Sequence, residues 1–241
     1  MYDMIEIYDE YKELGIKTRK ITQGQEFNLV KEFIEYRKNE FKPTHTNKLA
    51  IFIEPHINNS YPDIVFVEYN PHSFENWNDS RSILSTIDFK ILYYIFVTKR
   101  IDANGIVSQL GVTWKDTMLS IERLYDAKLI SRKRNNWCIR NKNIFSVKKI
   151  EAVEAKINKL DNVFQQALIN KNFASESYVL SNISKGIKES KMDRFGKFGI
   201  GLYSYNNNRF ERLAKSSKAS IPVSYSSIYF NEWIGRILMM N

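Results

Sequence analysis

The segment VKKIEAVEAKI, residues 147–157, has the character of a β-strand and carries charged groups close to its end. Successive side chains of a strand point to opposite faces, so Glu154 and Lys156 project to the same side and hold a carboxylate beside an ammonium group. By the same alternation Glu151 lies on the other face, where we expect an exposed partner of Lys148 or Lys149. The segment therefore predicts that a carboxylate and an ammonium group lie on one face of the strand near its end.

A second strand-like segment, DIVFVEY (residues 63–69), begins with an acid that follows Pro62. If the two strands are neighbours in one sheet, Asp63 adds a second carboxylate to Glu154. Paired carboxylates are the hard oxygen ligands that Mg²⁺ prefers. A metal there would polarise a scissile phosphate and lower the pKa of an attacking water, while Lys156 would orient that water or neutralise charge. The pattern indicates phosphodiester hydrolysis.

Pro62-Asp63 and Glu154-Ala155-Lys156 match the motif of the PD-(D/E)XK nuclease superfamily, which the chain resembles. The stretch EAKINKLDNVFQQALINKNFASESYVLSN (residues 154–182) is similar to the continuation seen in that superfamily, where the strand with the lysine leads into a helix containing Gln-Ala and then into another strand. FGKFGIGLYSY (residues 195–205) resembles the strand that follows. The resemblance covers about residues 24–205, apart from a block in the middle.

This resemblance implies an α/β fold of the restriction endonuclease-like type, a mixed sheet flanked by helices, and a Mg²⁺ cofactor for which Mn²⁺ can substitute. It implies catalytic roles for Asp63, Glu154 and Lys156, and it places Asp63, Glu154 and Ala155 at the metal. Gln166 would occupy the helix position that contacts the site or the phosphate backbone.

A further acid often joins such sites, and the sequence leaves two candidates open. Glu26 stands at the expected start of a helix just after Gly24, and Glu54 ends the strand-like segment KLAIFIEP (residues 48–55). Glu68 is disfavoured, because its odd offset from Asp63 puts it on the opposite face of a strand.

The block that separates the two motif halves reads as three helices followed by a hairpin. Residues 87–99 and 101–110 form apolar helical patterns, and Gly111 suits a helix C-terminus. Thr113 with Asp116 fits a capping box that starts the third helix. LISRKRNNWCIR (residues 129–140) predicts two short strands around a basic Asn135-Asn136 turn. The block resembles the winged-helix family of helix-turn-helix modules.

A winged helix implies contact with DNA through the third helix and the hairpin. On this interpretation the third helix buries a stripe of Met118, Ile121, Leu124 and Tyr125 and turns its other side to the groove. The expected DNA contacts are Lys115, Ser120 and Arg123 on the helix, and Arg132, Lys133, Arg134 and Arg140 in the hairpin, which could contact phosphates. The alternative is a module that mediates protein contacts only.

These patterns divide the chain into a first nuclease-like part (1–84), an inserted winged-helix domain (85–143) and a second nuclease-like part (144–241). Asp63 and Glu154 are 91 positions apart, and the insert occupies most of that interval. Around it we expect two helices within the first 40 residues, strands at 48–55, 63–69, 147–157, 176–183 and 198–205, a helix at 158–170, and a C-terminal helix. Residues 185–197 read as a basic polar stretch, and residues 206–220 as a loop containing one short helix. Phe52, Phe66 and Val153 are expected in the core.

Composition narrows the class of partner. The 241 residues carry 36 Lys and Arg against 27 Asp and Glu, a net charge of +9, which favours polyanionic partners. A single cysteine, Cys138, excludes an internal disulfide or a cysteine-based zinc site. No signal-like or membrane-spanning run is present, so a cytoplasmic protein is expected.

The sequence thus predicts a Mg²⁺-dependent endonuclease that cuts double-stranded DNA, with a role in host defence such as restriction implied by the family. Cleavage of both strands would need two active sites, which makes a homodimer plausible. The principal alternative is a DNA-binding transcription regulator whose nuclease-like scaffold is inert, and a third is an RNA-processing nuclease that uses the same site.

Overall fold

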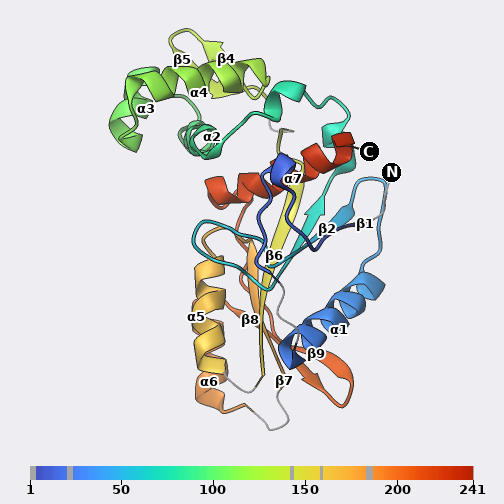
Figure 1. Cartoon of the computed structure of the whole chain (residues 1–241). Coiled ribbons are helices and arrows are strands. Elements are labelled where there is room, and N and C mark those ends of the chain that lie inside the picture. Colours follow the sequence, from blue (N-terminus) through green and yellow to red (C-terminus); the bar gives the residue numbers. More distant parts are fainter. Residues whose placement is uncertain (1–3, 21–23, 142–143, 158–159, 183–186, 241) are drawn as a thin grey trace.

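The computed structural model of the chain describes residues 4–20, 24–141, 144–157, 160–182 and 187–240 (Figure 1). It is an α/β structure built on one seven-stranded mixed sheet, as the sequence predicts. The strands lie in the order β1-β2-β3-β6-β7-β8-β9. Their bounds are β1 Met4–Ile7, β2 Lys48–Ile53, β3 Ile64–Tyr69, β6 Val147–Ile157, β7 Glu176–Asn182, β8 Gly201–Asn206 and β9 Arg209–Ala214.

The long strand β6 is the centre of the sheet. It pairs antiparallel with β3 on one side and parallel with β7 on the other. The register joins Ile64 to Val153, so Asp63 lies just past the last paired residue of β3, beside Glu154. The sequence-based expectation that these two strands are neighbours is therefore confirmed, although the chain makes a long excursion between them.

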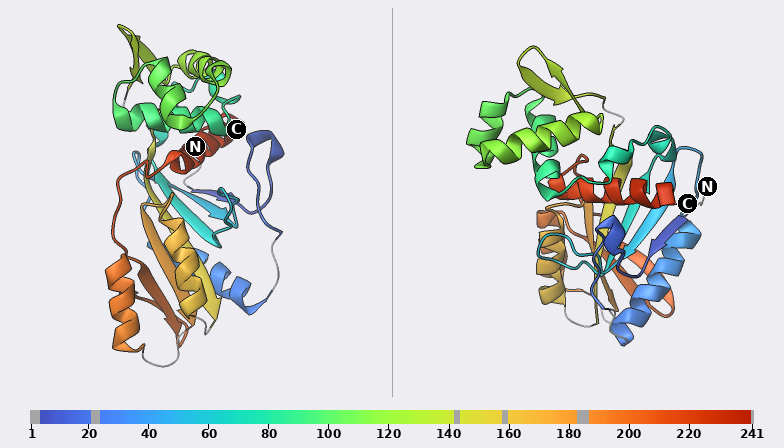
Figure 2. Two further views of the ribbon diagram at one scale, coloured as in Figure 1. Left: turned by 90° about the vertical axis from the view of Figure 1, so that its left-hand side faces the viewer. Right: turned by 45° about the horizontal axis from the view of Figure 1, so that its top comes forward.

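Helices cover both faces of the sheet (Figure 2). Helix α1 (Gln25–Glu40) packs on one face, where its apolar side chains meet Ile51, Phe66, Val153 and Tyr203. The opposite face is covered by α7 (Tyr225–Met240) over β2, β3 and the first half of β6, and by α5 (Leu160–Asn170) and α6 (Glu189–Phe198) over β7 and β8. Phe52, Phe66 and Val153 are buried as expected.

The excursion between β3 and β6 contains a compact unit, the helical insert (residues 86–139). It comprises α2 (Thr86–Thr98), α3 (Ala103–Leu110), α4 (Trp114–Asp126) and a hairpin of β4 (Ile130–Lys133) and β5 (Asn136–Ile139). Gly111 ends α3 in the left-handed conformation, and Thr113 caps α4 by accepting from the Asp116 amide. An isolated bridge joins Ile101 to Trp137 of the hairpin. The insert has its own apolar core.

Helix α7 joins the insert to the sheet, and it crosses between them in Figure 1. Ile228 packs into the core of the insert, whereas Phe230, Trp233 and Ile234 pack on the sheet. Buried Glu232 accepts two hydrogen bonds from Arg81, which lies in a short 3-10 helix (Asp79–Arg81) on the chain leading into the insert. Two further 3-10 turns span Lys12–Leu14 and Pro71–Phe74.

The same helix also binds the chain that leaves the insert. Asn231 accepts from the Ser146 amide at 2.7 Å and donates to the Ile144 carbonyl at 3.2 Å. Arg236 donates to the Leu84 carbonyl at 3.0 Å on the entering side. Both connections of the insert are therefore hydrogen-bonded to one helix.

Several predicted elements are wrong. The first of the two helices expected before residue 40 is a strand, β1, which pairs parallel with β2. The basic stretch expected at 185–197 contains helix α6, and the loop expected at 206–220 contains β9, which forms a hairpin with β8. Asn207 and Asn208 turn this hairpin with φ of 49° and 59°, a conformation that Asn tolerates better than most residues.

Glu151 was expected to be exposed, and it is 1 % exposed. It accepts hydrogen bonds from Arg37 of α1 and, at 2.7 Å, from Lys149. The expected partnership with Lys149 is thus present, but in the interior, where a second cation makes burial tolerable.

Among the residues that the structure describes, no helix is both long and apolar enough to cross a bilayer.

Candidate active site

Several of the predicted residues line a pocket of about 310 Å³ at the end of β6 that lies farther from the insert. The ends of β2 and β3 and the first turns of α1 complete its walls. Its lining residues are Arg19, Glu26, Phe27, Val30, Ile53, Glu54, Asp63 and Lys156. Four groups chosen from the sequence, Asp63, Lys156 and the two competing acids, therefore share one cavity.

Asp63 is fixed by the backbone of β6. Its Oδ2 accepts a hydrogen bond of 2.7 Å from the Ala155 amide. The pairing of β3 with β6 stops at Ile64, so the side chain of Asp63 takes the place that a further backbone acceptor would have. The amide and carbonyl of one strand residue point to the same side, which directs the Ala155 carbonyl toward this carboxylate.

Glu154 lies beside this pair and is 3 % exposed. Asn170, the last residue of α5, donates to its Oε1 at 2.7 Å. The Oδ1 of Asn170 is buried and has no hydrogen-bond partner among the described residues. Helix α5 therefore fixes one oxygen of Glu154 and leaves the other free of that contact.

Burial and mutual repulsion act on both carboxyl groups. Burial raises the pKa of Asp63 to about 6; the charges of Glu54 and Glu26 act in the same direction, and the Ala155 amide and Arg19 oppose them. Burial also raises the pKa of Glu154 well above its usual value, and the charge of Asp63 adds to that rise. The groups that stabilise the anionic form of Asp63 and Glu154 therefore do not offset burial and the neighbouring negative charges.

Lys156 does not compensate the pair directly, because its Nζ donates to Glu26 Oε2 at 2.8 Å. Glu26 lies in the first turn of α1, where the helix dipole favours an acid. Both side chains remain partly exposed, at 32 % and 45 %. The helix thus holds the ammonium group of Lys156 at the mouth of the pocket.

Glu54 binds a different cation. Its Oε2 accepts from Arg19 Nε at 2.5 Å, and Arg19 Nη2 lies 3.7 Å from Asp63 Oδ1. Glu54 has φ of 46°, a left-handed conformation that costs a non-glycine residue free energy and recurs at functional sites. Arg19 was missed from the sequence, because it lies outside any strand, helix or motif that could have singled it out.

The oxygen donors fit a divalent cation in type and in charge. Asp63, Glu154 and the Ala155 carbonyl are hard oxygen ligands of the kind that Mg²⁺ and Mn²⁺ take, and water supplies the rest of such a shell. Burial is the largest cause of the raised pKa of both carboxyl groups, and the charge of Arg19, which lies 3.7 Å from Asp63 Oδ1, offsets only part of the rise. Within the described ranges no set of three or more His, Cys, Asp or Glu side chains is grouped to hold a metal. A metal here would rest on two carboxylates and one carbonyl.

Gln166 is not at the site. It is exposed on α5, one helical turn before Asn170, and it is Asn170 that contacts Glu154. The residue of α5 that contacts Glu154 is therefore Asn170 and not the predicted Gln166.

The exposed face of α4 differs from the predicted one. Ser120 is fully buried and donates to Asp88 Oδ1, and Arg123 binds the same carboxylate at 2.8 Å. The residues buried on α4 are Thr117, Ser120, Ile121 and Leu124, whereas Met118 and Tyr125, expected inside, are 42 % and 54 % exposed. Of the helix residues predicted to contact DNA, Lys115 is exposed.

The hairpin of the insert presents its cations to solvent. Arg132, Lys133, Arg134 and Arg140 are all exposed. At its base a polar cavity of about 510 Å³ is lined by Lys128, Arg140 and Lys148, together with the neutral or weakly basic side chains of Asn70, His72, Ser73, Asn76, Asn141, Phe145 and Ser146. The described residues that line it include three cations and no acidic side chain, which makes this lining electropositive.

Comparisons with known proteins leave the family open. No protein-family model and no curated protein matches the chain. Among solved structures, the crystal structure of protein VC1899 from Vibrio cholerae is 10% identical, with a TM-score of 0.24, over 88% of this chain and 74% of that one. A likeness at this level supports no argument about fold or function.

Proposed function

We propose that the chain is a divalent-metal-dependent endonuclease that hydrolyses phosphodiester bonds of double-stranded DNA. The observation that supports this most is the meeting of Asp63, Ala155 and Lys156 at one strand end, with Glu154 buried beside them. These are the positions that the PD-(D/E)XK motif assigns to metal ligands and to the catalytic lysine. On this proposal the sheet with its helices is a restriction endonuclease-like fold.

Each residue then has a role that follows from its contacts. A bound Mg²⁺ or Mn²⁺ would polarise the phosphate and lower the pKa of an attacking water. Asp63, held by the Ala155 amide, and Glu154, held by Asn170, present oxygens in fixed directions. Lys156 places its charge beside the phosphate and holds the nucleophilic water, and Glu26 keeps that ammonium group in place until substrate enters.

DNA binding is assigned to the helical insert, interpreted as a winged helix. Exposed Lys115 on α4 and the exposed cations of the hairpin would contact phosphates. The electropositive cavity at the base of the hairpin, with Lys128, Arg140 and Lys148, lies between the hairpin and the start of β6 and extends this surface toward the sheet. Both strands of a duplex would be cut by a homodimer, as in a restriction or related defence enzyme.

The test is cleavage of supercoiled plasmid DNA by the full chain in Mg²⁺, in Mn²⁺ and in EDTA. We expect nicked or linear products only with metal, and a loss of about 10²–10³-fold in rate for Lys156→Ala. Lys191→Ala is the matched control, because Lys191 is also ion-paired and partly exposed but lies on α6 with Asp161. Intact plasmid under all metal conditions would overturn the proposal.

A second candidate is a DNA-binding regulator with an inert scaffold. The contacts of Arg19 with Glu54 and Asp63 favour it, since a protein cation lies where a metal would otherwise neutralise charge. The regulator predicts sequence-specific binding with no strand loss in Mg²⁺, whereas the enzyme predicts that Lys156→Ala binds and does not cut. Competition between duplex DNA and RNA separates a deoxyribonuclease from an RNA-processing enzyme.

A further inference from the structure

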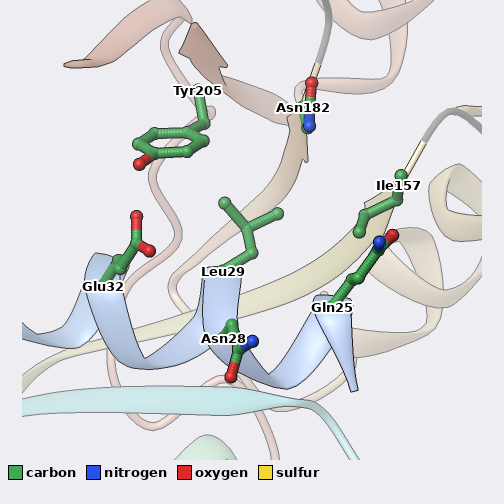
Figure 3. Close-up of a pocket in the computed structure, with 7 residues that line it drawn as sticks. All are labelled: Gln25, Asn28, Leu29, Glu32, Ile157, Asn182 and Tyr205. Carbon is green, nitrogen blue, oxygen red and sulfur yellow. The ribbon is translucent and has the colours of Figure 1, made fainter. Parts of the chain in front are cut away.

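A second pocket, of about 240 Å³, lies on the other side of the same helix (Figure 3). Its lining residues are Gln25, Asn28, Leu29 and Glu32 of α1, Ile157 of β6, Asn182 of β7 and Tyr205 of β8. In the close-up, Leu29 stands in the middle, Gln25 lies toward Ile157, and Glu32 faces the ring of Tyr205. We name this cavity the amide pocket.

The chemistry of the amide pocket differs from that of the active site. Three carboxamides, on Gln25, Asn28 and Asn182, each offer donors and an acceptor. Leu29 and Ile157 supply an apolar surface, and Tyr205 supplies an aromatic ring. Among the described residues that line the pocket there is no Lys or Arg, and the one charge among them is the carboxylate of Glu32, which raises the pKa of Tyr205 by accepting its hydrogen bond.

This combination matches the binding requirements of a nucleobase. Asn and Gln side chains pair with the donor and acceptor edges of bases, and unstacked bases pack on aromatic rings. An acidic acceptor such as Glu32 suits an exocyclic amino group, which adenine, cytosine and guanine carry. The apolar side chains of Leu29 and Ile157 offer a surface on which the flat faces of the base ring can pack.

The position of the pocket links it to the reaction. Ile157 follows Lys156 directly, and Gln25 precedes Glu26, so the two members of the Lys156–Glu26 ion pair each have a sequence neighbour in the amide pocket. Consecutive Cα atoms are about 3.8 Å apart. Helix α1 forms the wall between the two cavities, with Glu26, Phe27 and Val30 on one side and Leu29 with Asn28 on the other.

We propose that the amide pocket binds one unstacked nucleobase of the cleaved strand, next to the phosphate that Lys156 contacts. The inference rests on the proposed nuclease function and adds a specific substrate contact to it. Extrusion of a base from a duplex costs free energy, which a pocket of this kind returns through stacking and edge hydrogen bonds. Substrates that are mismatched or single-stranded at that position would therefore be cut faster.

The experiment is a scan of duplex oligonucleotides in which each carries one abasic position near the cut. We expect one position at which loss of the base lowers the cleavage rate by about tenfold or more. Asn28→Trp, which fills the pocket from an exposed position on α1, should lower cleavage of intact DNA and make the scan flat. Asn39→Trp is the control, because Asn39 is exposed on the same helix and does not line the pocket.

A second readout does not need cleavage. The Lys156→Ala chain with Mg²⁺ is mixed with oligonucleotides that carry 2-aminopurine at the same position, and we expect its fluorescence to rise several-fold when that base leaves the stack. Adding Asn28→Trp to this chain should remove the rise, and adding Asn39→Trp should keep it.

The outcomes separate the two proposals. Metal-dependent cleavage with a flat abasic scan, and with equal rates for the two Trp variants, would overturn the base pocket and leave the nuclease standing. A 2-aminopurine signal that Asn28→Trp abolishes, without cleavage in any metal, would overturn the nuclease and support the pocket. Absence of both signals would overturn both.

Discussion

Two glutamates of β6, Glu151 and Glu154, are three residues apart, equally buried and opposite in chemical state. Burial alone would raise the pKa of Glu151, but Arg37 and Lys149 outweigh it and lower that pKa. Among the described residues no cation forms an ion pair with Glu154: burial and the neighbouring Asp63 raise its pKa, and the hydrogen bond from Asn170 and the charge of Arg19 offset only part of the rise. On this strand the charge of Glu151 is therefore compensated by two cations, whereas the charge of Glu154 is not.

The difference separates structural from functional acids without reference to any family. A fully compensated carboxylate such as Glu151 contributes to folding, because removing it would leave two cations without their partner. An undercompensated pair such as Asp63 and Glu154 costs folding free energy, and such pairs are candidates for functional sites. The contrast can be tested residue by residue.

The largest expected effect is on cleavage by Glu154→Gln. The substitution keeps the shape and the contact with Asn170 but removes the negative charge, so we expect the rate to fall by about 10³-fold. Thermal unfolding should show no loss of stability. The comparison would be contradicted by a Glu154→Gln chain that cuts plasmid DNA at the rate of the unaltered chain.

Glu151→Gln should show the reverse pattern. Arg37 and Lys149 lose their shared anion in the interior, and we expect the free energy of unfolding to fall by about 3–5 kcal/mol. Urea denaturation followed by circular dichroism measures this loss. Cleavage by the chain that remains folded should be nearly unchanged, and a stability equal to that of the parent would show that Glu151 is not the structural acid.

Glu151 and Asp63 should also affect the free energy of unfolding in opposite ways as the pH changes. Because the pKa of Glu151 is lowered from 4.5, its contribution is present above that pH and is lost as pH falls through the lowered value. Because the pKa of Asp63 is raised from 3.8 to about 6, its contribution is present at low pH and is lost as pH rises through 6.

Denaturation curves of the metal-free chain between pH 3.5 and 7.5 test this dependence. Asp63→Asn should reduce the loss of stability between about pH 4 and 6, with the remainder due to Glu154, and leave the chain more stable than its parent at pH 7. Glu151→Gln should remove the loss at the acid end. Parallel curves for all three chains would refute the assignment.

The smallest expected effects extend the comparison to the helical insert. Arg123 is committed to buried Asp88, so Arg123→Ala should lower stability by about 1–3 kcal/mol. Exposed Lys133 has no such role, and Lys133→Ala should leave the melting temperature unchanged while it reduces the salt dependence of DNA affinity by about 0.9 in logarithmic slope. Titrations at several salt concentrations give this slope, and an unchanged slope would remove Lys133 from the DNA contacts.

The order of the central strands could be predicted because it depends on local signals. Residues 63–69 and 147–157 are recognisable strands, and the alternation of side chains is enough to place Glu154 and Lys156 at one end. The competition between Glu26 and Glu54 could not be resolved, because both line the same pocket and each binds a different cation.

What the sequence did not reveal depends on contacts between distant residues. The spacing of Ile5 and Tyr8 fits a helix, and only the pairing with β2 makes the segment a strand. On α4 the polar residues Thr117 and Ser120 are buried, because the Thr117 hydroxyl donates to the Thr113 carbonyl and the Ser120 hydroxyl donates to Asp88 of α2. The hydrophobicity of the sequence does not indicate such contacts. Arg19 lies at the site because it binds the carboxylate of Glu54, which is 35 positions away in the sequence.

The attachment of α7 to both connections of the helical insert has a geometric consequence. Strand β6 begins just after the insert and reaches Glu154, with Asp63 beside it, at its eighth residue, a span of about 23 Å at 3.3 Å per residue. The entering and leaving chains are both hydrogen-bonded to α7, which fixes where the insert is attached relative to the start of β6. On the proposed function, a duplex bound at the hairpin would be cut at a fixed number of base pairs from the bound sequence.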